Sequence, residues 1–157
     1  MRLVGIAALI AALLDQVSKY IVVHSMQLER VNSIEVLPPF LNFRYGENRG
    51  INFGLFGDDV SSWVLIGLAT VICLVVLWWL RHPQPKLAQF SGGLLIGGAI
   101  GNIFDRYWYG YVLDFLNMSC CGINNPFVFN VADIFIFAGA IGLAFFAKDA
   151  TKTKKGA

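Results

Sequence analysis

Residues 87–107, with the sequence LAQFSGGLLIGGAIGNIFDRY, are long and apolar enough to cross a bilayer as one helix, which needs about 20 residues. Small residues recur at every fourth position, so that they share a helix face that another helix can approach closely: Gly93, Gly97 and Gly101. The far end of the same helix carries polar side chains that a lipid-facing surface disfavours: Asn102, Asp105 and Arg106. This segment therefore predicts a tightly packed membrane helix that ends in a polar site.

The composition of the whole chain excludes most classes of soluble protein. Of its 157 residues, 57% are hydrophobic and 14% are charged, and the mean hydropathy is +0.63. Soluble domains are roughly 45–50% apolar and about 25% charged. The formal net charge of +2 is too small to attract a polyanion, which excludes nucleic acid as a partner. We expect a polytopic membrane protein with a single integral membrane domain over residues 1–157.

Four segments have the length and hydropathy of membrane spans, at residues 3–23, 60–80, 87–107 and 129–147. The first differs from a cleavable signal peptide because Asp15 and Lys19 interrupt its apolar run. Basic residues outside the spans gather on one side of the membrane: Arg2, Arg81, Lys86, Lys148, Lys152, Lys154 and Lys155. Both termini are therefore expected to be cytoplasmic, and the connections 24–59 and 108–128 extracytoplasmic, although the first contains arginines that acidic residues offset.

The first extracytoplasmic connection contains a strand pattern. Residues 40–45, FLNFRY, alternate with period two, and residues 34–37 before the Pro38-Pro39 break are placed to pair with them. We therefore expect a mainly α membrane protein in which four transmembrane helices carry a small extracytoplasmic β-sheet and loop cap.

Polar residues within the spans are the strongest functional signal, because each ionised group there costs about 2.5–3.5 kcal/mol to insert. Three spans contribute them: Asp15 and Lys19 in the first, Asn102, Asp105 and Arg106 in the third, and Asn130 and Asp133 in the fourth. Counted along the helices, all three groups fall in the outer half of the membrane. They are expected to meet in one layer near the outer face.

Two Asn-x-x-Asp units, at residues 102–105 and 130–133, allow two interpretations. In the first, the asparagines hold two carboxylates that share a proton, so that one acts as a base toward water and the other as an acid. In the second, each carboxylate only pairs with a cation: Asp15 with Lys19, and Asp105 or Asp133 with Arg106. Residue types alone do not separate the two. The cysteines and histidines have no metal-ligand spacing.

Five motifs in order make the chain similar to the signal peptidase II family, the bacterial intramembrane aspartyl proteases that process lipoproteins. They are Asp15-Gln16-Val17-Ser18-Lys19, Asn48-Arg49-Gly50-Ile51-Asn52-Phe53, Gly97-Gly98-Ala99-Ile100-Gly101-Asn102-Ile103-Phe104-Asp105-Arg106, Val112-Leu113-Asp114-Phe115 and Phe129-Asn130-Val131-Ala132-Asp133. Each motif is short, but five in order over nearly the whole chain are specific.

The resemblance implies a catalytic dyad of Asp105 and Asp133. It implies supporting or substrate-binding roles for Asp15, Lys19, Asn48, Gly50, Asn102, Arg106, Asp114, Asn130 and Ala132. The implied reaction is removal of the signal peptide from a diacylglyceryl-modified prolipoprotein, just before the lipidated Cys, with no metal or organic cofactor. The implied setting is the bacterial cytoplasmic (inner) membrane, where a monomer in contact with lipid has its active site near the outer face.

Some positions depart from the family pattern. Ile51 and Asn52 replace small residues, Ile134 stands where many members carry Ser, and the run 118–122 with its Cys120-Cys121 pair is unusual. These departures leave open the substrate preference and the covering loop. Two other functions also remain open: a small transporter or proton relay, which likewise uses intramembrane charges, and a non-catalytic binder of lipoprotein precursors.

Overall fold

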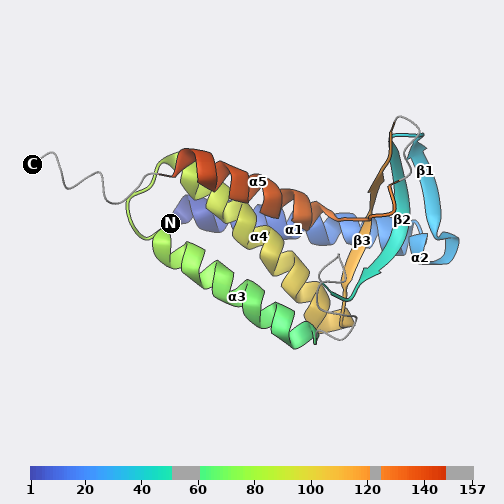
Figure 1. Cartoon of the computed structure of the whole chain (residues 1–157), viewed down its shortest axis with the longest axis horizontal. Helices are drawn as coiled ribbons and strands as arrows, with labels where there is room; N and C mark the ends of the chain where they lie inside the picture. The colour runs from blue at the N-terminus through green and yellow to red at the C-terminus, as the bar shows by residue number, and fades with distance from the viewer. Residues whose placement is uncertain (51–60, 121–124, 148–157) are drawn as a thin grey trace, which may run out of the picture.

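Helices run lengthwise through the molecule and strands gather at one end (Figure 1). The chain is described by a computed structural model that covers residues 1–50, 61–120 and 125–147. Its elements in chain order are α1 (Arg2–Lys19), the π-helical η1 (Tyr20–Ser25), α2 (Leu28–Val31), β1 (Ser33–Leu37), β2 (Leu41–Asn48), α3 (Ser62–Trp79), α4 (Lys86–Tyr109), β3 (Val112–Met118) and α5 (Val131–Phe146).

Three helices in the described ranges are long and apolar enough to cross a membrane: α1 continued by η1, α3 and α4. The fourth predicted span, at residues 129–147, is the apolar helix α5, but it has 16 residues. At 1.5 Å per residue these cover about 24 Å, less than the hydrocarbon core of about 30 Å. The mainly helical membrane fold is thus confirmed, whereas the count of four spans is not.

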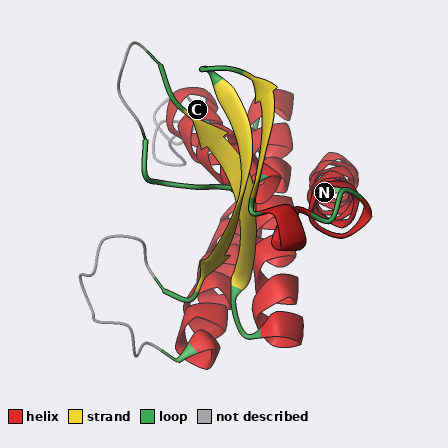
Figure 2. Cartoon of the chain, turned by 90° about the vertical axis from the view of Figure 1, so that its right-hand side faces the viewer, coloured by secondary structure: helices red, strands yellow, loops and turns green. Residues whose placement is uncertain are grey.

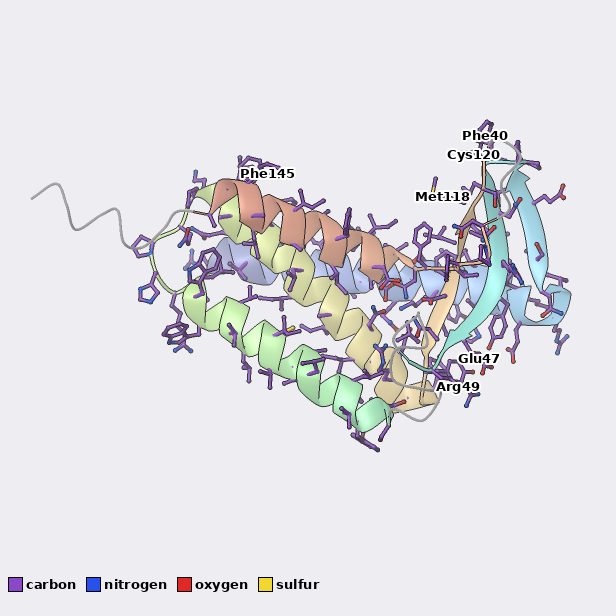
Figure 3. All side chains as sticks on the ribbon, viewed as in Figure 1. Phe40, Glu47, Arg49, Met118, Cys120 and Phe145 are labelled. Carbon is purple, nitrogen blue, oxygen red and sulfur yellow. The ribbon has the colours of Figure 1, made fainter. Side chains whose placement is uncertain are left out.

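The helices present apolar side chains outward, as lipid contact requires. On α3 the only residue classed as buried is Leu65. Trp63 and Trp78, near the two ends of α3, are 68% and 62% exposed, and Phe145 on α5 is 80% exposed. Figure 3 shows Phe145 projecting from the helical body, at the end away from the sheet. Water does not favour so much outward apolar surface, so the exposure pattern supports membrane insertion.

Helix α4 is central because its glycines allow close contact on two sides. A Cβ added at Gly93 would lie 2.6 Å from the Cβ of Ala7 on α1, and one at Gly101 would lie 2.6 Å from Oδ2 of Asp15. On the other side, a Cβ at Gly98 would lie 2.5 Å from the carbonyl oxygen of Ala132. The predicted small-residue face is therefore confirmed, and it brings the polar end of α4 against α1.

The three strands form one antiparallel sheet in the order β1-β2-β3. The predicted hairpin is confirmed, with Ile34 opposite Phe43 in the β1–β2 pair. The connection at residues 108–128 contributes the third strand, which was not predicted from the sequence, because β3 pairs with β2 there. Six of the seven β3 residues are buried or half-buried, so the strand lacks the alternation that marks a half-exposed strand.

The sheet packs on the ends of the helices through a separate apolar core. This core contains Val22, Val23, Leu28, Leu113 and Phe115. Viewed from the sheet end, the strands cross in front of the helix ends (Figure 2). Strand β3 therefore lies directly against the layer where the polar side chains of the helices meet.

Candidate active site

The start of α5 is fixed by a reciprocal cap. Asn130 precedes the helix, and its side-chain oxygen accepts a hydrogen bond from the backbone N–H of Asp133 at 3.0 Å. The Asp133 carboxylate in turn accepts from the Asn130 backbone N–H at 3.2 Å. This capping box satisfies two backbone donors at the helix end and gives the Asp133 side chain a defined direction.

The other asparagine of the two Asn-x-x-Asp units contacts the opposite helix. Asn102 Nδ2, on α4, donates to Asp133 Oδ1 at 2.9 Å. Asn130 Nδ2 donates to Asn102 Oδ1 at 3.2 Å. The expectation that Asn102 would orient the carboxylate of its own helix, Asp105, is not what these contacts show. The asparagines of both units instead contact Asp133 and each other.

Asp114 on β3 is the second carboxylate at this cluster. Its Oδ1 accepts from Asn130 Nδ2 at 2.6 Å, and its Oδ2 accepts from Asn48 Nδ2 at 3.2 Å. The side chain is buried, and burial together with the negative charge on Asp133 raises the pKa of Asp114 to about 7. Asn130 thus contacts both Asp114 and Asp133, and the two carboxylates interact electrostatically.

Asp105 lies in a different set of contacts. Its Oδ2 is 2.7 Å from Lys19 Nζ and accepts from the backbone N–H of Leu113 at 3.1 Å. Its Oδ1 accepts from Gln16 Nε2 at 2.8 Å. The side chain has no exposed surface. Asp105 is therefore an ion-paired, fully hydrogen-bonded carboxylate that faces α1 rather than Asp133.

Asp15 completes this ion-pair cluster. Its Oδ2 is 2.7 Å from Lys19 Nζ, which confirms the predicted pair one helical turn apart. Its Oδ1 accepts from the backbone N–H of Ala132 at 2.9 Å. Arg106, the predicted cation for Asp105 or Asp133, has no ion pair with either among the described residues; the partner of Asp105 is Lys19.

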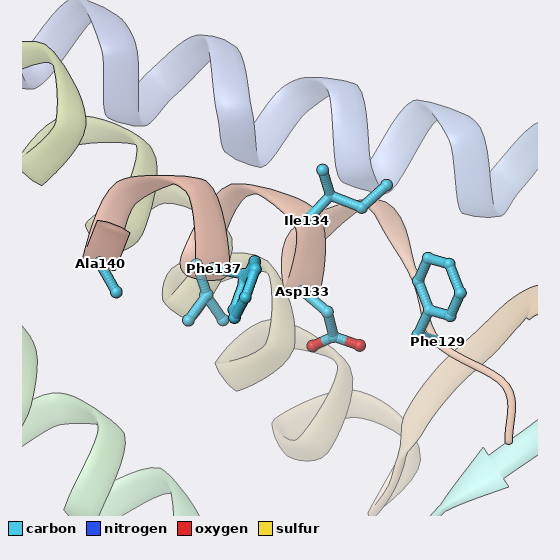
Figure 4. Close-up of a pocket in the computed structure, with 6 residues that line it drawn as sticks. Phe129, Asp133, Ile134, Phe137 and Ala140 are labelled. Atoms are coloured by element: carbon cyan, nitrogen blue, oxygen red, sulfur yellow. The ribbon is translucent and has the colours of Figure 1, made fainter. Parts of the chain in front are cut away.

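Three hollows reach the carboxylates from different sides. A groove of about 490 Å³ runs along α5 to Asp133 and is otherwise lined by Phe129, Ile134, Ile136, Phe137 and Ala140. Figure 4 shows the Asp133 carboxylate between Phe129 and Phe137. A smaller hollow of about 160 Å³ beside the sheet is lined in part by Asp114 and Asn48. A third, of about 490 Å³, is lined by Asp105 together with Lys19, Tyr20 and His24.

Two buried polar atoms beside the cluster have no hydrogen-bond partner among the described residues. They are Nε of Arg106 and Oδ1 of Asn48. The Arg106 guanidinium interacts electrostatically with Asp114 and Asp133. One unpaired donor and one unpaired acceptor next to two carboxylates suit the recognition of a peptide group, which offers a carbonyl oxygen and an N–H.

Two further residues bear on the site: Gly50, which was predicted from the sequence, and Gln16, which was not. Gly50 follows β2, and no atom of the described residues lies within 4 Å of a Cβ added there. Ile51, Asn52 and Cys121 lie outside the described residues. The sequence reasoning did not single out Gln16, whose amide contacts both Asp15 and Asp105. Its position within the motif at residues 15–19 was the available signal. The described ranges contain no group of three metal-ligating side chains.

Comparisons with known proteins point to one family. The family model described as "Signal peptidase (SPase) II" matches residues 7–147. Lipoprotein signal peptidases of Alteromonas mediterranea and Sphingopyxis alaskensis are 40% and 37% identical, over 89% and 87% of this chain and 76% and 79% of theirs. Two solved bacterial membrane enzymes, at 28% and 27% identity, give TM-scores of 0.74 and 0.75. The matches cover 88% and 97% of this chain, and 82% and 92% of the solved chains.

Proposed function

Since the chain belongs to the signal peptidase II family and is a protease, we propose that it removes the signal peptide from diacylglyceryl-modified prolipoproteins by aspartyl catalysis. The scissile bond is the peptide bond just before the lipidated Cys. The observation that carries the catalytic assignment is Asn130, whose side chain contacts Asp114 and the backbone of Asp133 at once.

The reacting pair in this proposal is Asp114 and Asp133. The motif resemblance implies Asp105 with Asp133, but three donors occupy the two oxygens of Asp105, and one of them is the ammonium group of Lys19 at 2.7 Å. A carboxylate whose two oxygens already accept from three donors has little room to take a proton from a catalytic water molecule. Asp114 faces no such cation at contact distance among the described residues. We therefore place Asp105 among the positioning residues.

Burial and the neighbouring charge on Asp133 hold a proton on Asp114 near neutral pH, with a pKa of about 7. The carboxylate of Asp133 takes a proton from a water molecule as the water oxygen bonds to the scissile carbonyl carbon. Asp114 gives its proton to the carbonyl oxygen. Collapse of the tetrahedral intermediate breaks the C–N bond, and the proton held by Asp133 moves to the departing nitrogen. A hydroxyl group of the intermediate returns its proton to Asp114 as the carboxyl product forms, which restores both aspartates.

The two unpaired polar atoms beside the pair have matching roles. The guanidinium of Arg106, whose Nε has no hydrogen-bond partner in the described part of the chain, stabilises negative charge that develops on the carbonyl oxygen. The Oδ1 of Asn48, which accepts no hydrogen bond from residues 1–50, 61–120 or 125–147, accepts a backbone N–H of the substrate. Asn102 and Asn130 keep Asp133 oriented during the reaction.

The apolar groove along α5 is assigned to the signal peptide, which enters sideways from the bilayer. The acyl chains of the substrate stay in lipid, where each buried CH₂ contributes about 0.8 kcal/mol. In this arrangement one domain over residues 1–157 has four spans, with α5 as the fourth, and both termini are cytoplasmic. The monomer lies in the bacterial inner membrane with its site near the outer face.

The test is cleavage of a diacylated prolipoprotein by the purified protein in detergent, with the unmodified precursor as the control substrate. Asp114→Asn and Asp133→Asn are each expected to lower turnover by more than about 10³-fold, because each removes a proton-transferring group. Asp105→Asn is expected to retain measurable turnover. If Asp114→Asn cleaves normally while Asp105→Asn does not, the pair is Asp105 and Asp133, as the motif predicts.

A further inference from the structure

Asp105 holds the backbone next to one reacting aspartate. Its Oδ2 accepts a hydrogen bond from the N–H of Leu113 at 3.1 Å. Leu113 directly precedes Asp114 on β3, and its side chain is also buried in the core beneath the sheet. Because the peptide unit between the two residues is planar, a fixed Leu113 limits where the Asp114 Cα can lie.

Asp15 makes the equivalent contact on the other side. Its Oδ1 accepts from the N–H of Ala132 at 2.9 Å, and Ala132 directly precedes Asp133. Ala132 has no exposed surface and lies where α5 packs on α4, opposite Gly98. Each reacting aspartate therefore follows a residue whose backbone N–H is bound by a buried carboxylate.

Lys19 joins these two carboxylates. Its Nζ lies 2.7 Å from Oδ2 of Asp15 and 2.7 Å from Oδ2 of Asp105, and all three side chains are at most 3% exposed. Gln16 bridges the same two carboxylates through its amide, at 3.2 and 2.8 Å. Lys19 Nζ also reaches Asn102 Oδ1 at 3.4 Å. Breaking such a buried set leaves an uncompensated charge, so its geometry is strongly maintained.

We propose that the Asp15–Lys19–Asp105 triad sets the separation of the two reacting aspartates by holding the peptide groups that precede them. The inference rests on the proposed function, since it takes Asp114 and Asp133 as the reacting pair. The triad residues are positioning residues: they act through Leu113 and Ala132 and transfer no proton to the substrate.

The chemistry makes the separation of the pair important. One water molecule must contact the base while the acid reaches the carbonyl oxygen, and a misplacement of about 1 Å in such a site lowers the rate by about 10²-fold. Asp114 is on the strand β3 and Asp133 on the helix α5, so no regular backbone hydrogen bonding between the two elements fixes their distance. A connection through a third element, α1, fixes their relative position.

The first test separates positioning from reaction. Asp15→Asn and Asp105→Asn each leave one ion pair with Lys19 and remove no other charge, so both variants are expected to fold. We expect kcat on a diacylated lipopeptide to fall by about 10- to 100-fold, with KM within about threefold, because neither residue lines the α5 groove. Glu35→Gln, at an exposed position on β1, is the matched control with unchanged kinetics.

The second test asks whether the triad acts as one unit. If Lys19 couples the two contacts, the double variant Asp15→Asn with Asp105→Asn should be about as slow as the slower single variant. Independent effects would multiply, giving a loss near the product of the two. A multiplicative result overturns the proposal, as does wild-type kcat in both single variants or complete loss of turnover in Asp105→Asn alone.

The third test keeps the charge and changes the position. Asp105→Glu retains the negative charge near Lys19 but lengthens the side chain by one CH₂. The groups acting on Asp114 are Asp133, Lys19, Arg106 and the amides of Asn48 and Asn130, and none of them is altered. We expect a shift in the pH at which kcat changes near pH 7, the part of the profile that reports the ionisation of Asp114. An unshifted profile with unchanged kcat overturns the proposal.

The same variant distinguishes failure of the triad from failure of the proposed function. If the unaltered protein does not cleave the lipopeptide, the proposed function fails. The carboxyl titration of Asp114, followed by NMR of protein labelled with ¹³C-aspartate in micelles, then replaces the kinetic readout. A shifted titration in Asp105→Glu supports the triad, and an unshifted one overturns it.

Discussion

Replacing Asp114 by Asn is expected to remove activity and to change how the stability of the protein depends on pH. The pKa of this carboxyl is raised from 3.8 to about 7, first by burial and then by the charge on Asp133. A carboxyl with a raised folded-state pKa stabilises the protein when it is protonated. That contribution is complete below the unfolded-state pKa and is lost as the pH rises through the folded-state value.

The magnitude follows from the two pKa values. Each pKa unit corresponds to about 1.36 kcal/mol, so full ionisation of Asp114 costs about 4 kcal/mol of unfolding free energy. Between pH 5 and pH 8 the wild-type protein loses about 2 to 3 kcal/mol of this amount, since part is already lost below pH 5. Asparagine does not ionise and loses none of it.

The assay is equilibrium unfolding of the wild-type protein and Asp114→Asn at pH 5 and pH 8 in the same mixed micelles. Titrating groups that do not interact with Asp114 are shared by the two proteins and cancel in the comparison. The variant's stability relative to wild type should increase by about 2 to 3 kcal/mol from pH 5 to pH 8, while its cleavage activity is absent at both. A stability difference that is the same at both pH values would refute the reasoning, because Asp114 would then have an ordinary pKa.

Three further outcomes test the packing and the cap. Gly101→Ala places a Cβ 2.6 Å from Oδ2 of Asp15, so we expect about 1–3 kcal/mol of destabilisation by thermal unfolding. Gly67→Ala, whose added Cβ has no atom of the described residues within 4 Å, should lose none. Asn130→Ala removes the helix cap and should cost about 1–2 kcal/mol as well as most of kcat, measured by unfolding and by cleavage. Glu47→Gln breaks an exposed ion pair and should change stability by less than about 1 kcal/mol, so a larger loss would contradict the view that this pair is solvent-screened.

Much of the architecture follows from local pattern. An apolar run of about 20 residues, a glycine at every fourth position and a period-two alternation each specify an element or a contact without reference to the rest of the chain. The helices α1, α3 and α4 and the β1–β2 hairpin were predictable for that reason. Strand β3 was not, because it is buried on both sides and contains polar residues that serve the site rather than the pattern.

The polar layer was also evident in the sequence, since charges inside spans are costly in any fold and their depth follows from helical rise. The sequence did not show which residues of that layer contact one another. Asp105 and Asp114 are nine positions apart and both look like partners for Asp133. The packing of α4 on α1 directs Asp105 to Lys19, and the return of β3 along the helix ends brings Asp114 to Asn130. Residue types and spacing thus determine which groups are present at the site. The rotation of one helix and the path of one strand determine which two carboxylates share Asn130, because both depend on contacts between segments far apart in the chain.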